Sequence, residues 1–172
     1  MIRFEKLSAT ENAYPFEDAV VAANYKNGTF GTVSSGTFTA GAGFKAIMQV
    51  EDGDNANTDS YEVPTGSHAR IADFSKSNGQ VLNVTANQLP ASFAVGNKLV
   101  ADSYGKLKVE ANPDGNYFSV IEKTKYGARV GVVVVAEEID LSDYVNKDQL
   151  GVANGVATLD GTGKLTTAQR PE

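Results

Sequence analysis

Alternating apolar and polar side chains are the clearest regularity along the chain, and they predict β-strands. Phe44, Ala46, Met48 and Val50 alternate with Lys45, Ile47 and Gln49. Successive side chains of a strand point to opposite faces of its sheet, so this spacing predicts a half-buried strand. A second short strand is predicted at residues 80–85. The turn residues Asp102–Gly105 separate two further apolar segments, 99–101 and 107–109, which predicts strand, turn and strand.

The most apolar part of the chain predicts a β-hairpin. Segments Tyr117–Lys123 and Arg129–Ala136 are joined through Tyr126-Gly127, and Asn112-Pro113-Asp114-Gly115 forms a strong turn before them. The second segment is rich in valine, so we expect a central strand that is buried on both faces.

Polar segments interrupt these predicted strands. Residues 51–60 hold aspartate, asparagine and glycine with almost nothing apolar, which predicts a surface loop. Segment Glu17–Tyr25 fits a short helix by its alanine content or a strand by Val20-Val21, and the pattern does not decide between them. Several short strands at this spacing predict a mainly β fold, a small barrel or sandwich.

Composition changes near Glu137, where an acidic segment begins, and this predicts two regions. We expect a β-rich body over residues 1–137 and a tail over residues 138–172. Ser142 is placed to cap a short helix over Asp143–Leu150, and glycine-rich sequence follows. The tail is too short to bury its own apolar side chains, so it either packs against a neighbouring chain or is disordered.

Composition then excludes several classes of function. The 172 residues include no cysteine and one histidine, which excludes disulfides, thiolate nucleophiles and multi-histidine metal centres within one chain. The formal net charge of −6 argues against non-specific binding of nucleic acid through a basic face. No apolar run approaches the length of a membrane helix, and the first residues lack the apolar core of a signal peptide. We therefore expect synthesis in the cytoplasm and neither nucleic-acid nor membrane partners.

Candidate reactive groups have simpler explanations. His68 lies in Ser67-His68-Ala69-Arg70, which is expected to begin a strand, and no Gly-x-Ser-x-Gly elbow accompanies it. The oxygen-rich loop Asp52–Asp59 lacks the EF-hand spacing, so a solvated loop is expected rather than a calcium site. The acidic run from Glu137 to Asp143 fits a charged hinge. We predict no catalytic residue, no cofactor-binding residue and no metal ligand, and hence a protein that is not an enzyme.

The tail carries a resemblance. The relevant run is Gly151-Val152-Ala153-Asn154-Gly155-Val156-Ala157-Thr158-Leu159-Asp160-Gly161-Thr162-Gly163-Lys164-Leu165, followed by Ala168-Gln169-Arg170-Pro171. This run resembles a segment of bacteriophage head-fibre and tail-fibre proteins, where the segment lies at trimeric junctions. The stretch 93–136 is similar in pattern to small β-rich capsid decoration proteins. The resemblance implies a structural virion protein on the capsid surface, a head-fibre or decoration protein, and a homotrimer.

Two sets of contact residues are predicted on this basis. Apolar tail residues would line an oligomer seam, with glycines that allow close approach and a lysine–aspartate pair between chains; the residues alone would equally permit a dimer. The predicted oligomer interface comprises Val152, Val156, Leu159, Asp160, Gly163, Lys164 and Leu165. The N-terminal arm, with Ile2, Arg3, Phe4 and Lys6, is the candidate contact with the major capsid protein, either as a strand added to a neighbour's sheet or simply as the first strand of the body.

An alternative function remains open from the sequence. Fibre-type proteins also serve as tail-fibre or adhesion modules that bind host surface glycans, and a further fibre protein could attach to the tail. Because the chain is acidic, we expect docking to depend on shape and apolar contact unless the docking site is locally basic. The sequence does not decide between a head and a tail location.

Overall fold

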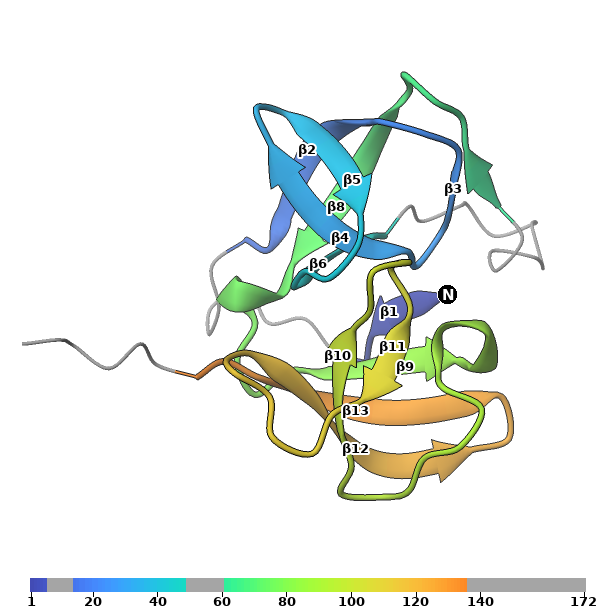
Figure 1. Cartoon of the computed structure of the whole chain (residues 1–172), viewed down its shortest axis with the longest axis vertical. Helices are drawn as coiled ribbons and strands as arrows, with labels where there is room; N and C mark the ends of the chain where they lie inside the picture. Colours follow the sequence, from blue (N-terminus) through green and yellow to red (C-terminus); the bar gives the residue numbers. More distant parts are fainter. Residues whose placement is uncertain (6–13, 49–60, 136–172) are drawn as a thin grey trace, which may run out of the picture. The chain divides into compact units, whose positions relative to one another are not determined.

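The structure is a computed structural model, and it describes residues 1–5, 14–48 and 61–135, which belong to one compact unit over residues 1–135 (Figure 1). The fold is mainly β, as predicted. It combines a closed five-stranded barrel, a six-stranded antiparallel sheet and a two-stranded ribbon of β3 (Tyr25–Lys26) and β7 (Glu62–Val63). The predicted tail over 138–172, with its short helix, lies outside the described residues.

The barrel closes in the order β2-β5-β4-β6-β8. Its strands are β2 (Phe16–Val21), β4 (Phe30–Ser34), β5 (Thr37–Ala40), β6 (Lys45–Ile47) and β8 (His68–Asp73). Strands β2 and β5 pair in parallel and the other neighbours pair antiparallel. The interior is filled by Ala19, Val21, Phe38, Ile47, Val63, Ala69 and Ile71. The segment that the sequence left undecided is therefore a strand, because Ala19 and Val21 alternate into this core.

The six-stranded sheet has the order β1-β9-β13-β12-β10-β11. Its strands are β1 (Ile2–Phe4), β9 (Val81–Thr85), β10 (Lys98–Ala101), β11 (Leu107–Val109), β12 (Tyr117–Thr124) and β13 (Gly127–Val133). The predicted strand at 80–85, the strand–turn–strand around residue 103 and the hairpin of β12 with β13 are confirmed. Short 3-10 turns follow β8 (Phe74–Lys76, η1) and β9 (Ala86–Gln88, η2).

Two strand predictions need correction. Strand β13 is central, but only alternate residues are buried, so it is not covered on both faces. Val130 and Val132 face the core while Gly131 and Val133 face outward, and a valine run does not distinguish these environments. Conversely, β6 was predicted to be half-buried but is buried on both faces at its end. Ala46 packs in the core between barrel and sheet, and Ile47 packs in the barrel interior.

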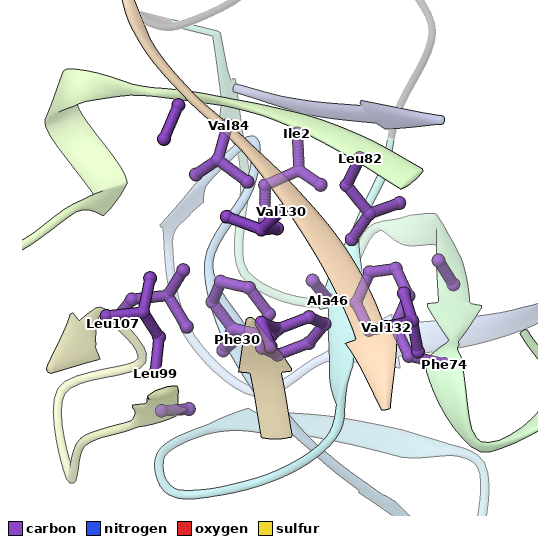
Figure 2. Packing of buried hydrophobic residues seen from close by; sticks show 14 of the residues in the cluster. Ile2, Phe30, Ala46, Phe74, Leu82, Val84, Leu99, Leu107, Val130 and Val132 are labelled. Carbon is purple, nitrogen blue, oxygen red and sulfur yellow. The ribbon is translucent and has the colours of Figure 1, made fainter. Parts of the chain in front are cut away.

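The larger core joins the barrel to the sheet through phenylalanine rings. Figure 2 shows Phe30 and Phe74, from the barrel and the turn after it, among valines and leucines of the sheet. Phe118 of β12 lies 5.4 Å from Phe30 and 5.3 Å from Phe74 between ring centroids. Because these contacts join distant parts of the sequence, barrel and sheet share this larger core beside the barrel's own, and the two parts should unfold together.

A backbone contact also ties the β10–β11 turn to the barrel. The N–H of Phe30 donates to the carbonyl oxygen of Gly105 at 2.9 Å. Gly105 has a φ of +73°, and a Cβ there would lie 2.4 Å from the Phe30 carbonyl oxygen. Glycine is required here both for the left-handed backbone and for the close approach.

We expect Gly105→Ala to destabilise the fold by more than about 2 kcal/mol, since left-handed strain and a backbone clash add. Gly36→Ala is the matched control: Gly36 has a φ of +75° with open space around it, so only the left-handed penalty of about 1 kcal/mol applies. Chemical denaturation of both variants measures the difference. Equal losses would show that the turn does not depend on the contact with Phe30.

An ion-pair network closes the end of the barrel beside η1. Lys45 Nζ lies 2.5 Å from Glu17 Oε1 and 3.3 Å from Asp73 Oδ2. Asp73 also accepts hydrogen bonds from the Ser75 amide and hydroxyl. Burial of Asp73 opposes ionisation, but the Ser75 hydrogen bonds and the Lys45 charge outweigh it and hold the pKa of this carboxyl below its ordinary value of 3.8.

This network predicts that the stability of the fold depends on pH in the acid range. Because the pKa of Asp73 is lower in the folded chain, its stabilisation is present above about pH 3.8 and is lost as pH falls towards the folded value. Asp73→Asn should therefore lower Tm at neutral pH, and the difference from the wild type should shrink as the pH falls below 4. Thermal unfolding over a pH series checks this. A difference that stays constant with pH would contradict it.

Candidate docking surface

The N-terminal segment proves to be the first strand of the body, which was one of its two predicted roles. Strand β1 pairs with β9 in the register Ile2↔Val84, Arg3↔Asn83 and Phe4↔Leu82. Ile2 is only 2% exposed, and Phe4 packs against the same core. Arg3 is exposed on the opposite face of the sheet. Of the predicted capsid contacts, Arg3 is thus available to a partner and Ile2 is not, while Lys6 lies outside the described residues.

The predicted oligomer interface is not described by the structure. All seven of its residues, from Val152 to Leu165, lie outside the described residues, and so do the acidic loop Asp52–Asp59 and the acidic run after Glu137. Their roles stay predictions from the sequence.

The face of the six-stranded sheet that points away from the shared core, here termed the outer face, is the strongest candidate docking surface. Strand register places its side chains in rows. One row runs Arg3, Asn83, Arg129 and Glu122 across four strands, and the next runs Val81, Gly131, Ser119 and Lys98. A further pair is Val133 with Tyr117, and Val100 lies opposite Lys108 on the β10–β11 hairpin.

The centre of the outer face is unusually apolar for a sheet surface that nothing in the described chain covers. An antiparallel sheet with one free face normally alternates apolar residues inward and polar residues outward. Here the outward residues include Val81, Val100, Tyr117, Ile121 and Val133. Ile121 is 44% exposed at a β-bulge in β12, beside the position where a Cβ on Gly131 would lie.

Cationic side chains surround this apolar centre. The ammonium of Lys98 lies 5.1 Å from the centroid of the Tyr117 ring. Arg129 donates to both carboxylate oxygens of Glu5 and to Glu122, each at 2.9 Å. The hydrogen bonds that Arg129 donates to Glu122 and then to Glu5 raise the pKa of Arg129 above its ordinary value. This network holds Arg129 of β13 between Glu5, which follows β1, and Glu122 of β12. Arg3 and Lys98 complete the basic rim.

Positive charge is concentrated in one stretch of the sequence, and part of the rim comes from that stretch. Residues 93–129 hold six Lys and Arg against four Asp and Glu, whereas the rest of the chain holds nine against seventeen. This stretch, which contains β10, β11 and β12, is therefore net positive in an otherwise acidic protein. A locally basic site is the condition under which long-range attraction to an acidic partner becomes available.

Of the candidate reactive groups, His68 is the one that lies within the described residues. His68 begins β8 as expected, and its Nδ1 pairs with Asp18 on the outside of the barrel, where the His68 side chain is 71% exposed. Within the described residues, no three His, Asp or Glu side chains converge where they could hold a metal ion. No helix among those same residues has the length and apolar character needed to cross a membrane.

Comparison with known proteins does not assign the chain to a family. No protein-family model matches the chain, and no curated protein or solved structure matches it significantly.

Reasoning from the sequence missed the outer face. Its residues come from all six strands of the sheet, and the direction in which each side chain points depends on which strands are neighbours. The one signal available was charge: lysine and arginine are concentrated between residues 93 and 129, in a stretch where valine, tyrosine and isoleucine recur.

Proposed function

We propose that the chain is a structural, non-enzymatic virion protein that decorates the exterior of a bacteriophage capsid as a head-fibre or decoration trimer. The observation that carries the proposal is the tail segment with Leu159-Asp160, Gly163-Lys164 and Gln169 with Pro171, which resembles trimeric fibre junctions. The closed barrel and sheet sharing one core are consistent with a compact body that serves as a building unit.

The outer face is the docking site in this proposal, and its occupant is an acidic surface of the major capsid protein. Two features support this occupant. The rim residues Arg3 and Lys98 supply positive charge, and the apolar centre supplies area that a partner can remove from water. Tyrosine and arginine are also the residue types that most often anchor protein interfaces. Three copies joined by the tail would bind the shell more tightly than one.

Labelling of intact virions tests this function. Antibodies raised against the folded protein should bind the heads of untreated virions in electron micrographs, and a virion assembled without the protein is the control. Label at the tail tip instead would favour the adhesion function, and absence of label from the virion would contradict the proposal.

A further inference from the structure

A cleft opens between the barrel and the sheet, and it meets the edge of the outer face at Val100 and Lys108. It has a volume of about 580 Å³, which falls within the roughly 300–1,000 Å³ typical of small-ligand sites. One wall is the β5–β6 connection, with Ala42, Gly43 and Phe44. The other wall is formed by the β10–β11 hairpin and the connection to β12 that includes the Asn112–Gly115 turn.

The barrel wall of the cleft is rigid. A Cβ on Gly43 would lie 2.1 Å from the Gly31 carbonyl oxygen, so the connection packs directly against β4. The Phe44 ring stacks on Phe118 with centroids 4.7 Å apart and an angle of 29° between planes. A preformed wall lowers the ordering cost that a ligand would otherwise have to offset.

The sheet wall carries a balanced set of donors and acceptors. Asn112 and Asn116 offer amides, Glu110 and Asp114 offer carboxylates, and Lys108 offers an ammonium. Lys108 Nζ lies 3.4 Å from Glu110 Oε2, so its charge is already matched. The Asn116 side-chain oxygen accepts from the Val135 amide at 2.9 Å, which fixes the orientation of its carboxamide.

This lining discriminates between ligand classes. Two carboxylates against one paired lysine disfavour phosphate and other anions. Polar groups along one wall disfavour a lipid chain, whose burial would leave them without partners. Apolar carbon from Phe44, Val100 and Pro113 beside these donors and acceptors suits a neutral polyhydroxylated ligand, which has hydroxyl groups on its edge and carbon-bound hydrogens on its faces.

We infer that this cleft binds a neutral saccharide, through hydroxyl contacts to the Asn112–Asn116 segment and apolar contact with Phe44 and Pro113. The inference can be tested apart from capsid docking, because Phe44, Asn112 and Asp114 line the cleft and are not among the outer-face residues. It gives the body a second function, the binding of a glycan, beside the proposed docking to the capsid.

Amide chemical-shift titration of the full chain tests the inference, with maltose, lactose, cellobiose and diacetylchitobiose as probes. At least one sugar should shift amides of residues 41–44 and 112–116 in a saturable manner. The double variant Asn112→Ala, Asp114→Ala should weaken that binding about tenfold or more, since two hydrogen-bonding side chains are lost. Its amide spectrum shows in the same experiment that the fold is intact.

Glu62→Ala is the control variant, because Glu62 is exposed on β7 and does not line the cleft; it should bind as the wild type does. Absence of saturable shifts with every sugar would overturn the inference, and so would shifts that the double variant leaves unchanged. Loss of capsid binding in the double variant, without any response to sugars, would instead make the cleft a protein contact. Sugar binding in a protein that fails to bind capsids would support saccharide binding in the cleft and contradict the proposed function.

Discussion

Phe118→Ala should remove about 3–5 kcal/mol of stability, the range found when a fully buried phenylalanine is truncated in a core that cannot collapse around the space. Phe118 is completely buried and contacts the rings of Phe30, Phe44 and Phe74. Domains of this size are stable by roughly 5–15 kcal/mol, so the loss is a large share of the total.

The loss should appear as one cooperative transition. Phe118 belongs to the sheet, whereas Phe30 belongs to the barrel and Phe74 to the turn that leaves it, so the cavity weakens both parts. Denaturation followed by tyrosine fluorescence and by far-ultraviolet circular dichroism should give coincident curves. Tyr126→Ala is the control, since Tyr126 is an exposed turn residue and its loss should cost less than about 0.5 kcal/mol. Two separate transitions, with the barrel unaffected, would contradict the shared core.

Leu159→Asp should convert the predicted trimer to monomers. Three tail copies around one axis would bury apolar side chains that a single chain leaves in water, each worth about 1.5–3 kcal/mol when fully buried. An aspartate at this position would place three like charges at a dry axis, where an unpaired charge is costly.

Sedimentation velocity of the full chain measures this conversion. The wild type should sediment as three chains and Leu159→Asp as one. Thr166→Asp is the matched control, because it adds the same charge at a polar position of the sequence pattern and should remain trimeric. An undiminished trimer of Leu159→Asp would show that the seam lies elsewhere.

Local features of the sequence predicted where the strands lie better than they predicted which faces of those strands are buried. The hairpin of β12 and β13 was predictable because Tyr126-Gly127 marks a turn between two apolar segments. The closure of the barrel was not, because the parallel pairing of β2 with β5 and the contact of β6 with β8 join segments far apart in sequence. The misjudged burial of β6 and β13 has the same cause, since long-range neighbours decide which face is covered.

Arg3 is the one residue of the outer face that the sequence had suggested as a contact residue. A pattern of alternating residues in the arm could not separate Ile2, which completes the core, from Arg3, which faces outward, until the pairing of β1 with β9 was known. The same pairing changes the experiment of choice: deleting residues 1–7 would remove a core side chain and a strand, so point substitutions on the outer face are the informative variants.

Co-sedimentation with capsids that lack the protein tests the central claim most directly. The wild-type chain should pellet with such capsids and stay in solution without them. The double variant Lys98→Glu, Ile121→Asp should remain in solution, because it reverses a rim charge and buries a carboxylate in the docked apolar centre, at a cost of several kcal/mol. Thr39→Asp, on the exposed side of β5 in the barrel, should pellet as the wild type does. Wild-type protein that stays in solution with capsids, or an outer-face variant that pellets as fully as the wild type, would contradict docking through this face.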